Sequence, residues 1–278
     1  MRVLVRASFA LLLCGAASPA FAQSSPDWTG FYVGVYGGVV DPDDADDERL
    51  RFDRDLNGVF AETVTTTTGA DAFSPGFCGG TPLGNNAGAG CSGDETGVEG
   101  GVRAGYDWRL GGLVVGAVAE IGGADVEDSV TGFSTTPAAY EFRRELQSLA
   151  AIRARVGFAL GENLLLYGTG GYARGQVDNS FRTTNGANSF TARMDEEDAD
   201  GWQAGAGFEY RLAPGLTFVT EYIRTELDAP DYVIRVGQGT APATNPFVLA
   251  PNTTGTDIRR SSDDLTLNSL RIGMNWRF

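Results

Sequence analysis

Acidic and arginine side chains recur at alternate positions within apolar segments, and they are the residues of this chain best suited to chemistry. Alternate residues of an extended segment point to one face, so each segment carries its charges on one side. Carboxylates and guanidinium groups brought together in this way form charge-assisted hydrogen bonds. The set comprises Glu99, Arg103, Asp107, Arg109, Glu120, Arg153, Arg155, Glu209, Arg211, Glu221 and Arg271.

The residue types that are missing exclude most catalytic chemistry. The chain has 278 residues and no His, and its 21 basic residues are all Arg, so it has no Lys. It therefore offers no His general base, no Ser-His-Asp triad, no His-ligated metal and no Lys Schiff base. We expect no enzyme activity and no cofactor. A hydrolytic site made of Asp and Glu alone, at the base of a loop, stays open.

A net charge of -15 sets the character of the surface. The chain has 36 acidic residues, and its isoelectric point is near 4.4. Nucleic acids need a cationic face, so we expect no nucleic-acid partner. The acidic residues concentrate in Gly- and Thr-rich stretches, above all in Asp41 to Glu48. Solvated charge is the simpler interpretation of this run, and a Ca²⁺-bridged contact with anionic lipopolysaccharide is the alternative.

Residues 1–22 have the features of a secretory signal peptide. Two arginines precede a short apolar segment at 7–17, and Ala-Phe-Ala at 20–22 provides small residues for cleavage. We expect cleavage after Ala22 and export to the periplasm. A lipoprotein anchored through Cys14 is the less favoured alternative, because bulky Leu13 precedes that cysteine.

Two cysteines, Cys78 and Cys91, remain after this processing, and both lie in one Gly- and Asn-rich stretch. An oxidising compartment and an even number of cysteines predict a disulfide between them. Closing so short a loop stabilises it by about 3 kcal/mol on chain-entropy grounds. Two thiols without His are too few ligands for a zinc site, so we expect no bound metal.

Eight segments that must position these residues alternate between apolar and polar or small side chains, which is the pattern of β-strands. Within 98–109, for example, Val102 and Trp108 share one face while Glu99 and Arg103 share the other. A soluble sandwich also alternates. Here, however, one face is continuously apolar and the other carries both signs of charge, which predicts lipid outside and a polar interior. The segments are 28–40, 98–109, 113–121, 148–160, 164–177, 202–211, 216–222 and 270–278.

The connections alternate in length, and this predicts the topology. Short turns fall at 110–112, 161–163 and 212–215, whereas long stretches occupy 41–97, 123–144, 178–199 and 228–264. No stretch after the signal approaches the roughly 20 apolar residues of a membrane helix. We therefore predict an all-β protein in which residues 23–278 form an eight-stranded antiparallel up-and-down transmembrane barrel. Its strands have about 10–12 residues, its four long loops are extracellular, and the facing of strand 164–177 stays open.

Several segments resemble a known family. They are the entry segment Trp28-Thr29-Gly30-Phe31-Tyr32-Val33-Gly34-Val35-Tyr36-Gly37-Gly38, the segment Tyr167-Gly168-Thr169-Gly170-Gly171-Tyr172-Ala173, the pair Glu221-Tyr222 and the closing segment from Arg271 to Phe278. Together they are similar to the small outer-membrane β-barrel proteins of alphaproteobacteria, which are called outer-membrane immunogenic or porin-family proteins. The resemblance covers the mature chain and implies a barrel of OmpA or OmpX type. It leaves the activity open.

The last strand ends in an aromatic residue. Phe278 follows Trp276 at an alternate position, which resembles the signal that the outer-membrane assembly machinery reads. A buried edge strand that happens to end this way is the alternative. We expect the assembly machinery, outer-membrane lipid and lipopolysaccharide to be partners of the chain.

The charged set defines the predicted interior. An eight-stranded barrel is just wide enough for side chains to fill it, so we expect paired charges to close the lumen, with Glu120, Glu221, Arg153 and Arg155 at the centre. The predicted function is then a structural or surface-interaction role in the outer membrane, with an extracellular partner bound through the loops. A small-solute channel along the charged network is the alternative.

Overall fold

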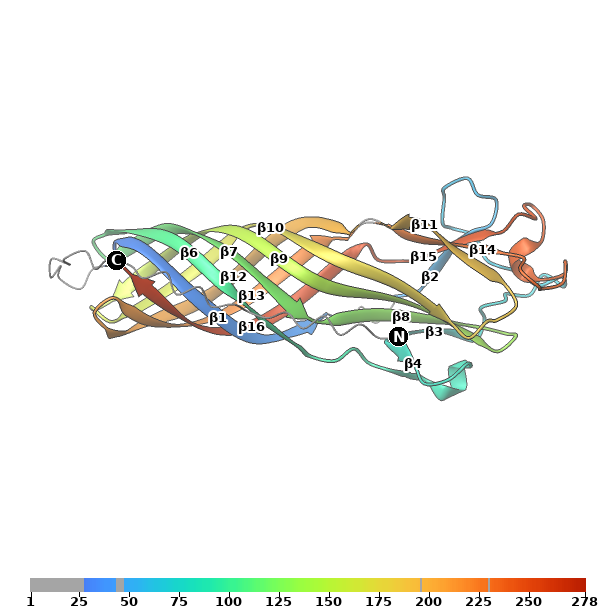
Figure 1. Cartoon of the computed structure of the whole chain (residues 1–278), viewed down its shortest axis with the longest axis horizontal. Helices are drawn as coiled ribbons and strands as arrows, with labels where there is room; N and C mark the ends of the chain where they lie inside the picture. The colour runs from blue at the N-terminus through green and yellow to red at the C-terminus, as the bar shows by residue number, and fades with distance from the viewer. Residues whose placement is uncertain (1–27, 44–47, 196, 230) are drawn as a thin grey trace, which may run out of the picture.

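The computed structural model describes residues 28–43, 48–195, 197–229 and 231–278, and the predicted signal peptide lies outside these ranges. Eight antiparallel strands form a closed barrel, which confirms the predicted fold (Figure 1). Each strand pairs with its neighbour in the chain, β1 pairs with β16, and both termini of this set lie at the end with the short turns. The strands are β1 (Gly30–Pro42), β6 (Gly97–Leu110), β7 (Leu113–Asp125), β9 (Ala138–Leu160), β10 (Leu164–Thr183), β12 (Asp198–Ala213), β13 (Leu216–Asp228) and β16 (Asp264–Arg277).

The two faces of the wall follow the predicted alternation. The large exposed apolar side chains of the described residues lie almost entirely on the barrel strands, and the exceptions are Val59, Leu83 and Phe278, which directly follows β16. The alternating partners point into the barrel and are buried. The facing of β10, which the sequence left open, is settled by Leu165, which is 0% exposed, and Leu166, which is 46% exposed.

Exposed tryptophan and tyrosine side chains lie at two levels of the outer wall, which we call the first and second aromatic rings. Trp108, Tyr210 and Trp276 lie near the short turns, whereas Tyr172 and Trp202 are paired neighbours farther along β10 and β12. Trp202 and Tyr210 are eight residues apart on one strand, which is about 26 Å of strand and about 20 Å along the axis of a tilted barrel. This spacing is near the thickness of an outer-membrane apolar band.

Several strands are much longer than the 10–12 residues predicted. β9 has 23 residues and β10 has 20, and both continue well past the second aromatic ring. The predicted long loops are not irregular: they contain β2 (Leu50–Asp53), β3 (Gly76–Gly79), β4 (Thr81–Pro82), β5 (Cys91–Ser92), β8 (Glu127–Ser134), β11 (Ser189–Asp195), β14 (Tyr232–Gly237) and β15 (Thr256–Arg260). Two short 3-10 helices, η1 (Ala87–Ala89) and η2 (Pro246–Val248), complete them.

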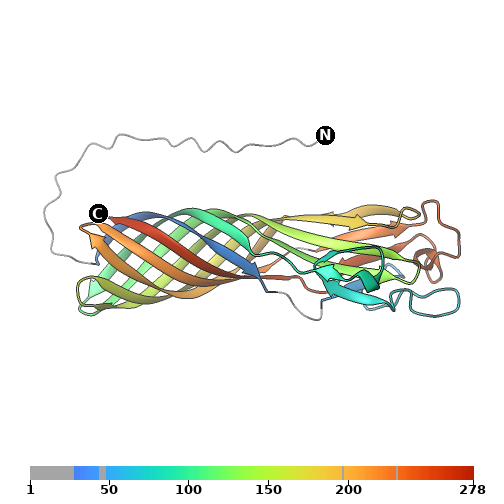
Figure 2. The ribbon, with the colours of Figure 1, turned by 90° about the horizontal axis from the view of Figure 1, so that it is seen from below.

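These elements form a folded body beyond the barrel, which we call the extracellular extension after the side of the membrane that the topology predicts for it (residues 50–92, 127–146, 177–195 and 232–260). One wall is the outer part of β10 and β9 with β8 and β3, and the other is the four-stranded sheet β11-β14-β15-β2. Figure 2 shows it continuing the barrel at the end opposite the C-terminus. No helix among the described residues is long and apolar enough to span a membrane.

An apolar core explains why the long strands continue outside the membrane. Aromatic and aliphatic side chains from both walls and from the first and fourth loops are buried between them. Burial of each large apolar side chain stabilises the extension by about 1.5–3 kcal/mol, so it folds as a second core. The buried members are Leu50, Phe52, Val64, Ala72, Phe73, Val130, Ala138, Tyr140, Phe142, Ile234, Val236, Phe247 and Ile258.

Candidate functional site

The lumen near the short turns contains a neutral group of two acids and two arginines. Arg155 Nη2 donates to Glu209 at 2.7 Å, and Arg277 Nη2 donates to Asp107 at 2.8 Å and to Glu209 at 3.3 Å. All four side chains are buried. The Tyr32 hydroxyl accepts a hydrogen bond from Arg155 at 3.1 Å. Trp28 is buried next to this group, in a cluster with Val114, Leu165, Tyr167 and Val219.

A second neutral group of three acids and three arginines fills the next level of the lumen. Glu120 binds two cations, because Arg153 Nη2 and Arg271 Nη1 each donate to it at 2.7 Å. Arg103 Nη1 donates to Glu221 at 2.7 Å. Arg271 also donates twice to Glu99, each time at 2.7 Å. Because every charge in the group has an opposite partner, this level carries no net charge.

Tyrosine rings separate and cover these charges. The Arg155 guanidinium lies 4.1 Å from the centroid of the Tyr167 ring, and Tyr36 is contacted by Arg103 at 4.9 Å and Arg271 at 4.8 Å. A desolvated cation over an aromatic face gains about 2 kcal/mol, which offsets part of the cost of burying it. The Tyr167 hydroxyl also donates to Glu221 at 2.8 Å.

An apolar layer closes the lumen above the second charged group. Along β16 the inward positions change from Arg271 through Ser269 to Leu267 and Leu265, and along β9 they change from Arg153 through Ala151 to Leu149. The buried members of this layer are Val40, Val126, Leu146, Leu149, Ala151, Ala173, Val177, Ala199, Leu227, Ala229, Leu265 and Leu267. The side chains of this layer have no polar atoms, and the buried polar side chains of the described residues that border it are Gln203, Thr225 and Ser269.

A third neutral group separates the apolar layer from the core of the extracellular extension. Arg260 donates to Glu48 and, at 2.9 Å, to Asp128, while Arg144 Nη2 donates to Asp128 at 2.6 Å. Burial raises the pKa of Asp128, but Arg260 and Arg144 outweigh it and hold the pKa below its usual value. The Asp128 carboxylate is therefore charged whenever this group is intact.

The structure brings nine of the eleven predicted charged residues into the first two groups. The other two, Arg109 and Arg211, lie near the short turns and are only partly buried: Arg109 Nε donates to the Gly111 carbonyl at 2.8 Å, and Arg211 lies over the Trp28 ring at 4.8 Å. Sequence reasoning omitted Arg277, Tyr32 and Tyr36 from the network. Each occupies the polar face of its strand, so the parity that identified Arg271 identifies them as well.

The predicted assembly-signal residues lie on the outer wall. Trp276 is 51% exposed and Phe278 is 55% exposed, at the end with the short turns. The Phe278 ring lies against that of Phe31, with centroids 6.1 Å apart. Recognition of this ending by the assembly machinery stays a prediction.

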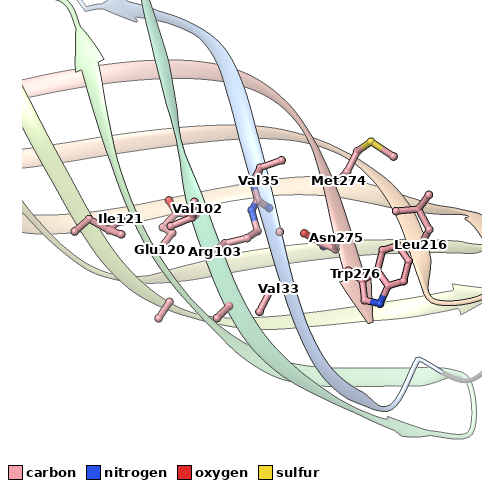
Figure 3. A pocket seen from close by; sticks show the side chains of 13 residues that line it. Val33, Val35, Val102, Arg103, Glu120, Ile121, Leu216, Met274, Asn275 and Trp276 are labelled. Atoms are coloured by element: carbon pink, nitrogen blue, oxygen red, sulfur yellow. The ribbon is translucent and has the colours of Figure 1, made fainter. Parts of the chain in front are cut away.

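The outer wall also carries a shallow apolar hollow of about 810 Å³ (Figure 3). Val33, Val35, Val102, Ile121, Met274 and Trp276 are among its lining residues. Arg103, Glu120 and Asn275 also border it, but all three are buried within the lumen. The hollow is therefore part of the lipid-facing surface.

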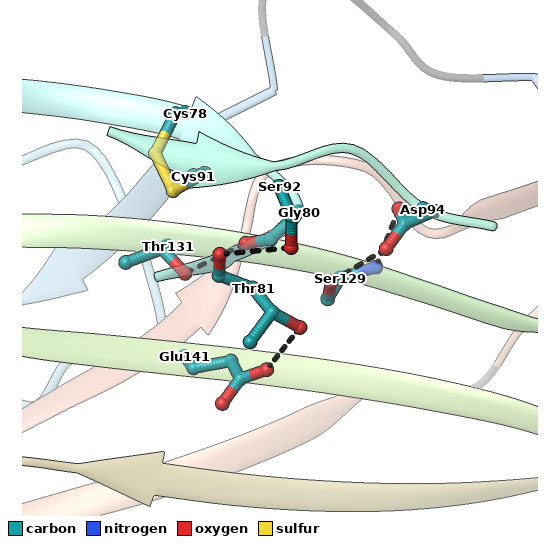
Figure 4. The surroundings of a disulfide bond; sticks show 9 residues. All are labelled: Cys78, Gly80, Thr81, Cys91, Ser92, Asp94, Ser129, Thr131 and Glu141. Carbon is teal, nitrogen blue, oxygen red and sulfur yellow. Dashed lines mark hydrogen bonds between the residues drawn. A yellow bond between two sulfur atoms is a disulfide. The ribbon is translucent and has the colours of Figure 1, made fainter. Parts of the chain in front are cut away.

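The predicted disulfide between Cys78 and Cys91 is present (Figure 4). It joins β3 to β5 and closes a flap made by residues 78–91. The flap is held against β8 and β9 by hydrogen bonds from Thr131 to the Gly80 carbonyl at 2.9 Å and from Thr81 to Glu141 at 3.0 Å. Nearby, Ser129 donates to Asp94 through its backbone N–H at 2.9 Å and its hydroxyl at 2.6 Å.

The acidic run at 41–48 lies partly outside the described residues. A different acidic cluster, Asp53, Asp55 and Glu62, has carboxylate oxygens within 4.8 Å of one another. Its carboxylates accept backbone hydrogen bonds: Asp53 from Gly58 at 2.7 Å and Glu62 from Arg54 at 2.5 Å. The cluster therefore shapes the turn after β2.

Comparison with known proteins shows which family has this architecture. The family model for the outer membrane protein beta-barrel domain matches residues 7–278. The 31 kDa outer-membrane immunogenic proteins of Brucella melitensis and Brucella suis are each 31% identical over 184 residues, which is 66% of this chain and 67% of theirs.

Solved structures give a more distant likeness. The outer membrane protein OprG of Pseudomonas aeruginosa aligns with a TM-score of 0.49 and 14% identity, over 90% of this chain and 97% of OprG. The outer membrane protease OmpT of Escherichia coli aligns with a TM-score of 0.41 and 11% identity, over 93% of this chain and 99% of OmpT. Since the family model matches nearly the whole chain, this protein belongs to the outer-membrane β-barrel family and resides in the bacterial outer membrane.

Proposed function

We propose that the protein is a closed, non-conducting barrel that anchors the extracellular extension for interactions at the cell surface. The observation that carries this proposal is the stacking of layers in the lumen: two neutral charged groups, an apolar layer and a third neutral group lie in sequence along the axis. An ion that enters from either end meets paired charges and then side chains with no polar atoms.

The energetics of the layers favour closure. Removal of one partner from a buried ion pair costs about 3–5 kcal/mol, so thermal fluctuation rarely opens a group of paired buried charges. The apolar layer excludes hydrated ions because a charge there loses its solvation. A path through the barrel has to break both kinds of layer together.

A surface role is supported by how much of the chain folds beyond the membrane. The extracellular extension has its own apolar core and its own disulfide, and it contributes Arg144, Asp128 and Arg260 to the third charged group. We also propose that the protein is not an enzyme, because the chain has no His or Lys and its relatives are named for their location and antigenicity.

Closure is tested by single-channel recording of the purified, folded protein in a planar bilayer. Slower gel migration after boiling verifies folding beforehand, and a porin added to the same bilayer afterwards verifies that the membrane reports channels. We expect no conductance steps from this protein. Stable, ion-dependent steps overturn the proposal and favour a small-solute channel.

The placement of the extension is tested on intact cells with Cys78 and Cys91. After mild reduction, a polymer-linked maleimide too large to cross the outer membrane is expected to add two labels to the mature chain. Unreduced cells are the control, because the disulfide leaves no free thiol there. Labelling that requires cell lysis places the extension on the periplasmic side and contradicts the surface role.

A further inference from the structure

All four extracellular connections meet at the end of the molecule opposite the C-terminus (Figure 2), where they enclose a pocket of about 440 Å³. The first connection contributes Ala72 and Phe73, and the second contributes the turn at 134–138. The third contributes 184–188, and the fourth contributes residues from 241 to 247. Because segments distant in the chain build it jointly, the pocket exists only when the whole extension is folded.

The base of the pocket is a triad of aromatic rings. The Phe73 centroid lies 5.2 Å from that of Tyr140 and 6.0 Å from that of Phe247, and the latter two are 5.8 Å apart. These rings belong to the core of the extension and are fixed by their packing. They give the pocket a rigid, apolar floor.

The wall is formed by three asparagines whose amides bond one another. Asn185 Nδ2 donates to Asn188 at 2.9 Å and to the Tyr140 hydroxyl at 2.9 Å. Asn188 Nδ2 donates to the Gly237 carbonyl at 2.8 Å and to Asn245 at 3.2 Å. Since these amides are engaged with one another, they tie the third and fourth connections to each other and to β9, and the pocket is formed in advance of any ligand.

The rim offers neutral hydroxyl groups. Thr135, Thr136 and Thr244 are exposed, line the pocket, and make no side-chain hydrogen bond to the described residues. None of the nineteen lining residues is charged, although 21% of the chain is charged, which leads us to expect about four in a set of this size. The pocket is therefore a neutral site on a protein of strong negative charge.

We propose that this pocket binds an uncharged saccharide unit. A sugar ring has hydroxyl groups that match the threonine rim and C–H groups that suit the apolar part of the lining, which includes Pro137, Pro242 and Pro246, and it needs no charged partner. Anions find no cationic donor in the lining, and cations find no carboxylate. The inference rests on the proposed surface role and names the chemistry of the partner that this role requires.

The test uses the full-length folded protein, labelled with a fluorophore, on an array of neutral and sulfated oligosaccharides. Purified O-polysaccharide from the producing bacterium forms a separate arm, which distinguishes a partner on the same cell surface from a foreign glycan. We expect binding to neutral sugars in one of these arms. Binding confined to sulfated sugars, or none in either arm, overturns the inference.

Two tryptophan variants locate the binding. Thr244→Trp fills the rim and is expected to weaken binding at least tenfold, which corresponds to about 1.4 kcal/mol. Thr253→Trp, on the same loop but outside the pocket, is the matched control and is expected to bind like the wild type. Equal binding by both variants refutes the pocket as the site. If the array shows no binding, while the barrel does not conduct and the cysteines are labelled on intact cells, only the saccharide inference is refuted. The proposed surface role then remains intact.

Discussion

Replacement of Glu221 by Gln is predicted to destabilise the folded barrel by about 3–5 kcal/mol, the cost of leaving one buried charge unpaired. Glu221 accepts from Arg103 Nη1 at 2.7 Å and is almost fully buried. Arg103 Nε and Nη2 have no hydrogen-bond partner among the described residues, so the Gln variant leaves this cation with no carboxylate. The Tyr36 ring, 4.9 Å away, compensates only partly.

The assay is guanidinium unfolding in detergent micelles, followed by tryptophan fluorescence, with gel migration as a check on folding. Asp43→Asn is the matched control, because it is the same acid-to-amide change at an exposed pair with Arg224 at 3.2 Å. We expect it to cost about 0–1 kcal/mol. The double variant Arg103→Met, Glu221→Gln removes both charges and is expected to recover at least half of the loss. If Glu221→Gln and Asp43→Asn unfold alike, the argument from buried pairing is wrong.

Three further predictions concern other parts of the molecule. Because Arg260 and Arg144 hold the pKa of Asp128 below its unfolded value of about 3.9, its stabilising contribution is complete above that pH and is lost as the pH falls below it. The protection factors of the amides at 127–146, which correct for the intrinsic pH dependence of exchange, are expected to fall between pH 6 and 2, and to fall less in Asp128→Asn. Reduction of Cys78–Cys91, which are 13 residues apart, is expected to cost the flap about 3 kcal/mol. After reduction, protease is expected to cut the flap at 79–90, while the barrel stays folded and keeps its heat-dependent gel migration. A reduced flap that resists protease as well as the oxidised one contradicts this prediction. Gly105→Ala is expected to cost about 1–3 kcal/mol, because a Cβ there lies 2.4 Å from the Tyr32 ring, whereas Gly112→Ala meets nothing within 4 Å. Equal unfolding midpoints for these two variants are the contrary result.

The wall of the barrel was predictable because its rules are local. Each strand must alternate every two residues between lipid and lumen, so Val102 and Arg103 take opposite faces whatever the rest of the chain does. The same parity fixes which charged side chains share the interior. It does not fix partners, because pairs such as Arg103 and Glu221 join strands that are far apart in the chain.

The extracellular extension was not predictable in this way. Its strands are short, and the core residues Val64, Phe73 and Phe247 lie in connections with no periodic pattern. Their burial depends on the long ribbons of β9 and β10 as a support, which is a tertiary property. The outer half of β9 also buries residues on both faces, so alternation fails there and the sequence indicates a loop.

The glycines and tyrosines of β1 have a consequence for strand pairing. A period of two cannot distinguish a correct alignment from one displaced by two residues, since both keep apolar groups outside. The inward residues of β1 alternate between tyrosine and glycine, in the order Tyr32, Gly34, Tyr36 and Gly38. Their partners on β6 are, in the same order, Gly105, Arg103, Gly101 and Glu99. Each tyrosine therefore faces a glycine, and each glycine faces a charged side chain. Displacement by two residues sets tyrosine against arginine or glutamate and glycine against glycine. The sizes of the inward side chains thus specify the register of β1 against β6. The side chains that close the lumen therefore also favour the correct alignment of the strands during assembly.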